Sequence, residues 1–339
     1  ALPLARTLPG RTRWRARGAA PMGRCATRVC TCTSVSVAAV AVALGLCASG
    51  IPRQLGFFTW MASQVPQLSG MSPAFTEGIE PRFDFLKLSG IDLSGQTAVV
   101  TGANSGLGFA TSLHLARQGA SVVMACRTAS KCESAAASIR ANTSRGAVQT
   151  LPLDTASLAS VRDFADRLLE KNATIEMLYL NAGVGGTADK LSVDGVELVF
   201  ATNVLGHHLL YTRLKVLLER ASRSRVVLTS SAANFATYEY GIADTLATLN
   251  GGERAMTYGH SKFAQILWAQ EATRQLPPDS AVQINAAHPG AVDTGIWEAV
   301  MLLGPTFGPP VRWFVQVLQE QFMWSAEDGA LTMLYALAL

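Results

Sequence analysis

Tyr258 and Lys262, in the stretch YGHSK, place a phenol and an ammonium four residues apart. Residues at positions i and i+4 share one face of a helix, and residues 255–275 have the composition of one. A phenol with its ordinary pKa of about 10 is a poor base at neutral pH, but a nearby cation favours its ionised form. The spacing therefore permits proton transfer at Tyr258. Because such pairs are frequent in ordinary helices, the rest of the chain must decide between the two interpretations.

A glycine-rich turn, TGANSGLG, places Gly102, Gly106 and Gly108 between an apolar run and a predicted helix that ends near Gln118. Glycine lets the backbone approach a pyrophosphate, and the helix N-terminus offers free amide donors. The spacing Gly-x3-Gly-x-Gly differs from the Gly-x-Gly-x-x-Gly fingerprint, and three glycines alone are a weak signal. Their place between strand and helix favours a dinucleotide-binding turn over a simple tight turn.

The end of the second predicted strand indicates which dinucleotide is bound. An acidic residue there would accept hydrogen bonds from the ribose 2′-hydroxyl of NAD(H). This chain has Arg127 instead, with Lys131 four residues later. A guanidinium can bind a phosphate through two hydrogen bonds, so the sequence favours NADP(H). The alternative is that Arg127 simply points into water.

Six short runs rich in Val, Ile or Leu are the candidate strands: QTAVVTG, ASVVMACR, AVQTLPLD, IEMLYLNAG, SRVVLTSS and VQINAAHPG. They alternate with helical stretches, which is typical of a parallel sheet covered on both faces. The predicted fold is therefore a single α/β domain with a doubly wound, Rossmann-type parallel sheet. The longest irregular stretch, residues 233–254, is where we expect substrate contacts.

Residues 1–76 differ in composition from the rest of the chain. They hold eight Arg and no Lys, Asp or Glu, and so contribute +8 to a net charge of +4. The remainder carries −4, so the basic excess of the chain does not argue for a nucleic-acid surface, and we expect no nucleic-acid partner. The apolar run at 35–50 resembles a signal-peptide core, and the Arg-rich composition equally suits an organellar transit segment; a tilted membrane anchor is a further alternative.

These differences divide the chain into three segments. We expect residues 1–76 to be a targeting or membrane-anchor leader, residues 77–94 a linker and residues 95–339 the nucleotide-binding domain. The expected location is an organelle or a membrane, plastid or endomembrane, and whether the leader is cleaved stays open.

Neither the cysteines nor the histidines indicate a metal site. Cys126 and Cys132 are the only cysteines outside the leader, and they suggest neither a disulfide framework nor a zinc pattern. Three histidines, His207, His208 and His288, also lack partners for a metal. We therefore expect no metal ion.

Five motifs occur together and in order: the glycine turn, NAG at 181–183, VVLTSS ending at Ser231, YGHSK, and HPGAVDT at 288–294. Over residues 95–338 this order and spacing resemble the classical short-chain dehydrogenase/reductase superfamily. The stretches TGANSGLG, MACRTASK, LYLNAG, NVLGHHLL and AEDGALTMLYALAL look most like the retinol dehydrogenase group and its neighbours, including protochlorophyllide reductases. The resemblance implies that residues 95–339 form an NADP-binding domain of this kind.

The resemblance also assigns the catalytic roles. Tyr258 would be the general acid in carbonyl reduction and the general base in alcohol oxidation. Lys262 would lower the tyrosine pKa and hold the nicotinamide ribose. Ser231 would donate a hydrogen bond to the substrate oxygen, with Ser230 as its nearest rival, and Asn203 would hold a water linking Lys262 to solvent.

The predicted cofactor-binding residues come from the glycine turn, the strand ends and the PG turn. Among them, Asp154 would accept from the adenine amino group or, alternatively, cap the helix that follows it. The full set is Gly102, Asn104, Ser105, Gly106, Leu107, Gly108, Arg127, Lys131, Asp154, Asn181, Ala182, Gly183, Tyr258, Lys262, Pro289, Gly290 and Thr294.

The expected reaction is NADP(H)-dependent hydride transfer to or from an apolar aldehyde, ketone or alcohol, retinoid-like or lipid-derived. Two alternatives stay open: light-dependent reduction of the protochlorophyllide type, and a non-catalytic NADP-binding scaffold or regulatory subunit. The complete set of Asn203, Ser231, Tyr258 and Lys262 argues against a scaffold.

The resemblance carries three further expectations. The apolar region 295–325 would be a lid that contacts substrate or membrane, or else packs as ordinary core. Helices near 203–220 and 255–275 would form a homodimer or homotetramer. Family chains continue beyond their last helix into a final strand, so we expect a seventh strand to be missing from this sequence.

Overall fold

The computed structural model describes residues 90–185, 191–237, 245–251, 254–296 and 323–338. All of them belong to one compact unit, Gln64–Leu339. The expected leader and most of the expected linker and lid lie outside the described residues, so the predictions about them stay predictions.

Six strands of the described chain form one parallel sheet in the order β3-β2-β1-β4-β5-β6. Each falls within one of the six predicted runs. The strands are β1 (Thr97–Thr101), β2 (Ser121–Cys126), β3 (Val148–Pro152), β4 (Met177–Leu180), β5 (Ser224–Thr229) and β6 (Val282–Ala287).

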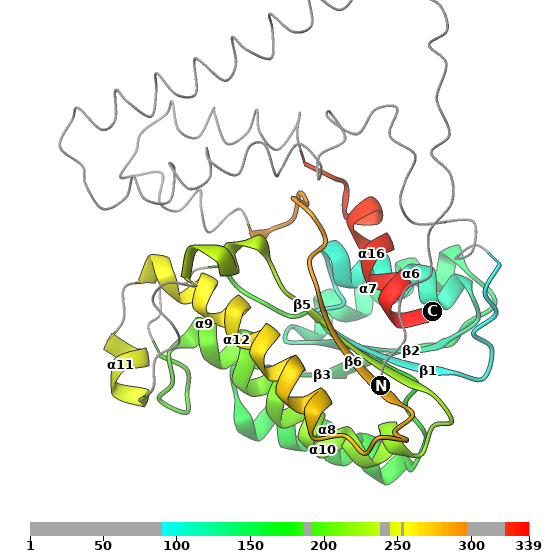
Figure 1. Ribbon diagram of the computed structural model, residues 1–339. Helices are drawn as coiled ribbons and strands as arrows, with labels where there is room; N and C mark the ends of the chain where they lie inside the picture. The colour runs from blue at the N-terminus through cyan, green and yellow to red at the C-terminus, as the bar shows by residue number, and fades with distance from the viewer. Residues whose placement is uncertain (1–89, 186–190, 238–244, 252–253, 297–322, 339) are drawn as a thin grey trace, which may run out of the picture. The chain divides into compact units, whose positions relative to one another are not determined.

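Helices cover both faces of this sheet (Figure 1). One face carries α6 (Gly106–Arg117), α7 (Ala129–Asn142) and α16 (Ala326–Ala338), and the other carries α8 (Leu158–Lys171), α10 (Gly206–Glu219) and α12 (Arg254–Arg274). Successive residues of β1 alternate between two cores, with Ala98 and Val100 in the first and Val99 in the second. The doubly wound α/β fold is therefore confirmed.

Shorter helical elements lie where the sequence showed no regular period. The three-residue helix α9 (Leu198–Phe200) runs into a π-helical turn, η1 (Ala201–Leu205), which leads directly into α10. The expected irregular stretch at 233–254 contains most of the 3-10 helix η2 (Ala232–Thr237) and the short helix α11 (Leu246–Gly251). π-Helical turns occur frequently at functional sites, and η1 contains Asn203.

The strand order reverses its direction between β1 and β4, which are neighbours in the sheet. Ligands of open α/β sheets bind at such a switch point, outside the carboxyl ends of the strands. The glycine turn follows β1, the NAG motif follows β4, and the serine pair follows β5. The topology therefore gathers the predicted motifs at one edge.

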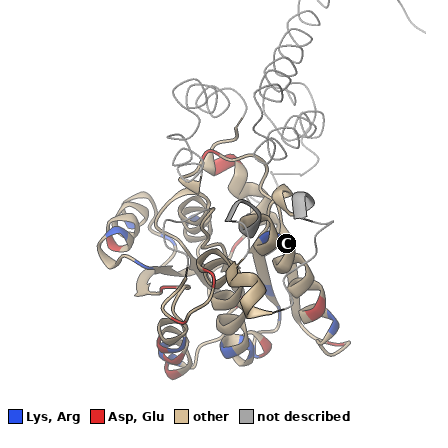
Figure 2. Ribbon diagram, turned by 90° about the vertical axis from the view of Figure 1, so that its left-hand side faces the viewer, with Lys and Arg blue, Asp and Glu red and all other residues tan. Residues whose placement is uncertain are grey.

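Charged residues of both signs occur together on the outer helices (Figure 2). Several are paired, such as Arg213 with Asp166 and Arg274 with Glu271. Within the described ranges, no helix has both the length and the apolar composition needed to span a membrane.

Candidate active site

Helix α12 presents Tyr258 and Lys262 on one face, as predicted. The Lys262 Nζ atom lies 5.3 Å from the centroid of the Tyr258 ring. The lysine side chain is almost fully buried, and its Nζ donates a hydrogen bond of 2.7 Å to the Thr229 carbonyl at the end of β5. This bond joins α12 to the carboxyl end of β5.

The two serines after β5 have different partners. Ser230 is buried, and its Oγ donates to the Lys262 carbonyl at 3.0 Å. The Ser231 side chain accepts from the backbone N–H of Ala233 at 3.2 Å and hydrogen-bonds the side chain of Tyr258. The structure therefore brings Ser231, and not its rival Ser230, to the tyrosine.

Burial dominates the protonation of both catalytic candidates. It raises the pKa of Tyr258 to about 12, and the hydrogen bond with Ser231 acts in the opposite direction. Burial also lowers the pKa of Lys262 to about 7. Lys262 is not among the causes of this shift, and the lowering of the tyrosine pKa by Lys262 stays a prediction. Near pH 7 the amine is charged only part of the time, and it donates to a carbonyl of β5.

The glycine turn has the geometry of a phosphate-binding turn. Gly102 and Gly106 have φ angles of +65° and +52°, which favour glycine. A Cβ at Gly108 would lie 2.4 Å from the Gly102 carbonyl oxygen, so α6 approaches β1 closely only because this residue is glycine. The side chain of Ser105, the N-cap of α6, makes no capping hydrogen bond, which leaves the first amides of this helix available to an anion.

Two other predicted cofactor residues lie close to this turn. A Cβ at Gly106 would be 3.2 Å from the Thr294 methyl group, which places Thr294 beside the turn. The predicted Leu107 has a buried side chain that packs with Val292 and Ala330, so only its backbone can serve a cofactor.

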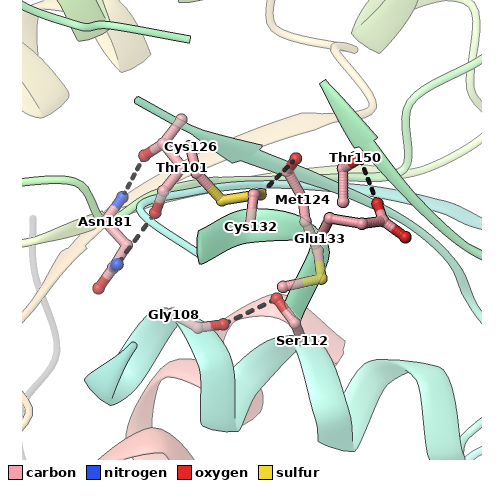
Figure 3. The surroundings of a disulfide bond; sticks show 9 residues. All are labelled: Thr101, Gly108, Ser112, Met124, Cys126, Cys132, Glu133, Thr150 and Asn181. Carbon is pink, nitrogen blue, oxygen red and sulfur yellow. Dashed lines mark hydrogen bonds between the residues drawn. A yellow bond between two sulfur atoms is a disulfide. The ribbon is translucent and has the colours of Figure 1, made fainter. Parts of the chain in front are cut away.

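The NAG motif is tied to the end of β1 by Thr101, a residue that the sequence analysis missed. The backbone N–H groups of Asn181 and Ala182 both donate to Thr101 Oγ1 at 2.9 Å. The Asn181 side chain returns a bond of 3.0 Å to the Thr101 carbonyl (Figure 3). A Cβ at Gly183 would lie 3.2 Å from Asn203 Oδ1, so this turn also borders the predicted Asn203.

Asn203 is fully buried, and its side chain is bonded at both ends. Its Oδ1 accepts from the Val184 N–H at 2.9 Å, and its Nδ2 donates to the Val184 carbonyl and to Ser261 Oγ. Its backbone carbonyl accepts from Gln265 Nε2 at 2.8 Å. Asn203 therefore links the chain after β4 to α12, and its role in holding a water stays a prediction.

Arg127 and Lys131 follow β2 and lie on the surface. Neither side chain has a hydrogen bond or an ion pair to another part of the chain that the structure describes. Both cations are therefore available to a ligand.

Cys126 and Cys132 form a disulfide, which corrects the expectation of no disulfide in the domain. Cys126 is the last residue of β2 and Cys132 lies in the first turn of α7, so the strand–turn–helix connection brings their Cα atoms to 5.8 Å (Figure 3). That separation is ordinary for a disulfide. The bond closes the short loop that carries Arg127 and Lys131.

Asp154 does not cap the helix after β3. Ser157 is the N-cap of α8 and accepts from the Ser160 N–H, whereas Asp154 Oδ1 accepts from the Ala156 N–H at 3.0 Å. The capping alternative is therefore wrong, and contact with adenine stays a prediction.

The remaining predicted residues, Asn104, Pro289 and Gly290, are partly exposed after β1 and β6, where Gly290 has a φ of +90°. No group of three or more metal-ligating side chains occurs within the described ranges.

A parallel sheet in this order, with a glycine turn at its switch point, is the arrangement of dinucleotide-binding α/β proteins. The family model described as short chain dehydrogenase matches residues 96–301. The chain belongs to this family and, within it, to the retinol dehydrogenase-like group. Membership implies an oxidoreductase that acts on a small molecule.

Three known proteins illustrate the similarity. Retinol dehydrogenase 13 of Homo sapiens is 36% identical over 227 residues, which cover 66% of this chain and 68% of that protein. The WW domain-containing oxidoreductase of Gallus gallus is 33% identical over 259 residues, 73% of this chain and 59% of that protein. The Pseudomonas aeruginosa RhlG/NADP active-site complex is 26% identical, with a TM-score of 0.55 over 73% of this chain and 91% of that one.

Proposed function

We propose that this protein is an NADP(H)-dependent oxidoreductase that transfers hydride between the nicotinamide and the carbon of an apolar aldehyde, ketone or alcohol. The observation that carries the proposal is the contact of Ser231 and Lys262 with Tyr258 at the edge where the glycine turn lies. Three segments far apart in the sequence converge there.

The residues at this edge fit a dinucleotide. The free amides of α6 and the close approach at Gly108 suit a pyrophosphate. Arg127 and Lys131 are exposed and have no ion pair with any residue that the structure describes, so each can bind a 2′-phosphate without breaking such a pair. These side chains support NADP(H) over NAD(H).

In carbonyl reduction NADPH would supply the hydride. Side chains of the protein would donate a proton and a hydrogen bond to the carbonyl oxygen of the substrate. Tyr258 Oη would donate its proton to the carbonyl oxygen as negative charge develops there, while the Ser231 hydroxyl donates a hydrogen bond to the same oxygen. The high pKa of Tyr258 keeps the phenol protonated at neutral pH, which suits the acid of a reduction. Lys262 would hold the nicotinamide ribose.

An apolar substrate is supported by the relatives' names. Retinol, named in the first of them, is an apolar alcohol with a corresponding aldehyde. We propose the same chemical class here, without the identity of the substrate.

The test is oxidation of NADPH and NADH by the full chain, with short and long apolar aldehydes and ketones.

Tyr258→Phe removes the proton donor and should lower kcat by at least about a hundredfold, the contribution typical of a general acid. Tyr211→Phe is the matched control, because Tyr211 on α10 packs edge-on against Trp268 on α12; it should leave kcat within about twofold. Equal turnover by the Tyr258→Phe variant would refute the assigned role. If the protein binds NADPH but reduces no carbonyl, pigments should be tested next as substrates. If these are not reduced either, a non-catalytic scaffold role is favoured.

A further inference from the structure

His207, near the start of α10, is a buried side chain with a partner at each ring nitrogen. It has no exposed surface. Its Nδ1 lies 3.1 Å from the Asn203 carbonyl oxygen in η1, and its Nε2 lies 3.0 Å from Thr101 Oγ1 at the end of β1. The ring therefore spans from the segment that holds Asn203 to the strand that opens the glycine turn.

The partners determine which nitrogen carries the proton. A carbonyl oxygen can only accept, so Nδ1 must be the donor to Asn203. A neutral imidazole then offers Nε2 as an acceptor, and at 3.0 Å it is a closer acceptor for the Thr101 hydroxyl than the Tyr179 carbonyl at 3.3 Å. Thr101 Oγ1 in turn accepts from the N–H groups of Asn181 and Ala182. Burial lowers the pKa of His207 to about 4, so the ring is neutral under ordinary conditions.

The contacts of His207 complete a circuit of hydrogen bonds that begins and ends on α12. Lys262 donates to the Thr229 carbonyl. Thr229 Oγ1 lies 2.9 Å from Tyr179 Oη, its closer acceptor, and 3.4 Å from Asn181 Oδ1, and the Asn181 N–H donates to Thr101. From Thr101 the circuit passes through His207 to Asn203, which bonds Ser261 and Gln265 on α12. His207 therefore joins two groups of residues. One group, Thr101 and Asn181, follows β1 and β4, and the other, Asn203 and its partners, contacts α12.

We propose that His207 is a positioning residue that fixes the glycine and NAG turns relative to the catalytic helix α12. Without the imidazole, Thr101 would lose its link to η1, and Asn203 would keep only its bonds to α12 and Val184. The cofactor turns and Lys262 could then shift relative to each other. The inference rests on the proposed function, because it assigns His207 to the placement of the same cofactor.

Three substitutions separate the two contacts of the ring. His207→Asn places an amide near Nδ1, so it can donate to Asn203 but does not reach Thr101. His207→Gln extends an amide toward the position of Nε2 and can meet Thr101. His207→Leu removes both bonds at similar volume. His208→Leu is the control on the neighbouring residue, which packs edge-on against Trp268.

The measurements are the Kd of NADPH by fluorescence titration, kcat and KM with an apolar aldehyde, and the melting temperature. Loss of a buried hydrogen bond is typically worth about tenfold. We therefore expect His207→Leu to raise the Kd of NADPH and to lower kcat by about tenfold each. His207→Asn should restore kcat but not the Kd, and His207→Gln should restore the Kd but not kcat. His208→Leu should change neither.

The possible outcomes are distinct. A lower melting temperature for His207→Leu or His207→Asn with unchanged Kd and kcat would show a purely structural role and overturn the inference. If His207→Leu does not fold, the other two variants test the inference. It holds if His207→Asn weakens only NADPH binding and His207→Gln lowers only kcat, and it is overturned if the two variants do not differ in this way. If the wild-type protein binds NADPH but reduces no carbonyl, the proposed function fails, and the Kd values alone still test His207. A wild-type protein that binds neither NADPH nor NADH overturns both.

Discussion

Arg127 is the residue on which the proposed choice of cofactor depends. Its guanidinium is exposed directly after β2 and has no partner among the described residues. We expect Arg127→Ala to raise the KM for NADPH by about tenfold, the worth of one charge-assisted contact of about 1.4 kcal/mol, with the KM for NADH nearly unchanged. Steady-state kinetics with both cofactors would measure this ratio.

The matched control for this prediction is Arg167→Ala, which removes an exposed arginine from α8. It should leave both KM values unchanged. An equal rise in both KM values for Arg127→Ala would show general damage to the turn, and no change at all would mean that Arg127 only faces water.

Among single residues, the sequence could predict those that lie within a short, recognisable motif. Tyr258, Lys262 and Ser231 could be predicted because each lies in a run with characteristic neighbours. Thr101 and His207 meet across 106 positions in the chain, and no local period reports such a contact. Their only sequence signal is the adjacency of Thr101 to the glycine turn and of His207 to the stretch that contains Asn203.

At the scale of elements, the close approach of α6 to β1 depends on Gly108. A methyl group there would meet the Gly102 carbonyl at 2.4 Å and the Asn181 side-chain nitrogen at 2.7 Å. We expect Gly108→Ala to destabilise the fold by about 1–3 kcal/mol, the usual effect of overpacking, and to weaken NADPH binding because both turns must move. Urea unfolding and cofactor titration would measure the two effects.

Gly251→Ala is the comparison for that variant. It adds the same methyl group in α11, where a Cβ would meet nothing within 4 Å, and should leave both the stability and the Kd of NADPH nearly unchanged. Wild-type stability of Gly108→Ala would mean that α6 can move away from β1 at little cost.

The elements themselves were largely predictable from hydrophobicity. Both faces of the sheet are covered, so the strands read as continuous apolar runs, and all six were found. The π-helical turn η1 and the short helices η2 and α11 were not, because one or two turns show no recognisable period. The disulfide was missed for a related reason: whether two cysteines meet depends on the path of the turn between them.

For the whole molecule, acid should reduce stability through the histidines. All five have a pKa lowered by burial, to about 4 for His207 and His288 and below the ordinary value for the others, His114, His208 and His260. Between about pH 6.5 and 4 the unfolded chain therefore binds more protons than the native protein. The free energy of unfolding must fall as the pH falls through this window, and His207 alone can contribute on the order of 3 kcal/mol.

Lys262 extends the same trend to higher pH. Its native pKa of about 7 lies below the ordinary value of 10.5, so the unfolded chain holds a proton that the native protein releases, and stability should rise between those two values. Urea unfolding at pH 5, 7 and 9 should give a steadily increasing free energy of unfolding. His207→Asn should have a shallower slope between pH 5 and 7, since it removes the most deeply buried imidazole. An unchanged slope in that variant would mean that His207 is not neutral in the native protein, which would also contradict the donor and acceptor roles assigned to its ring.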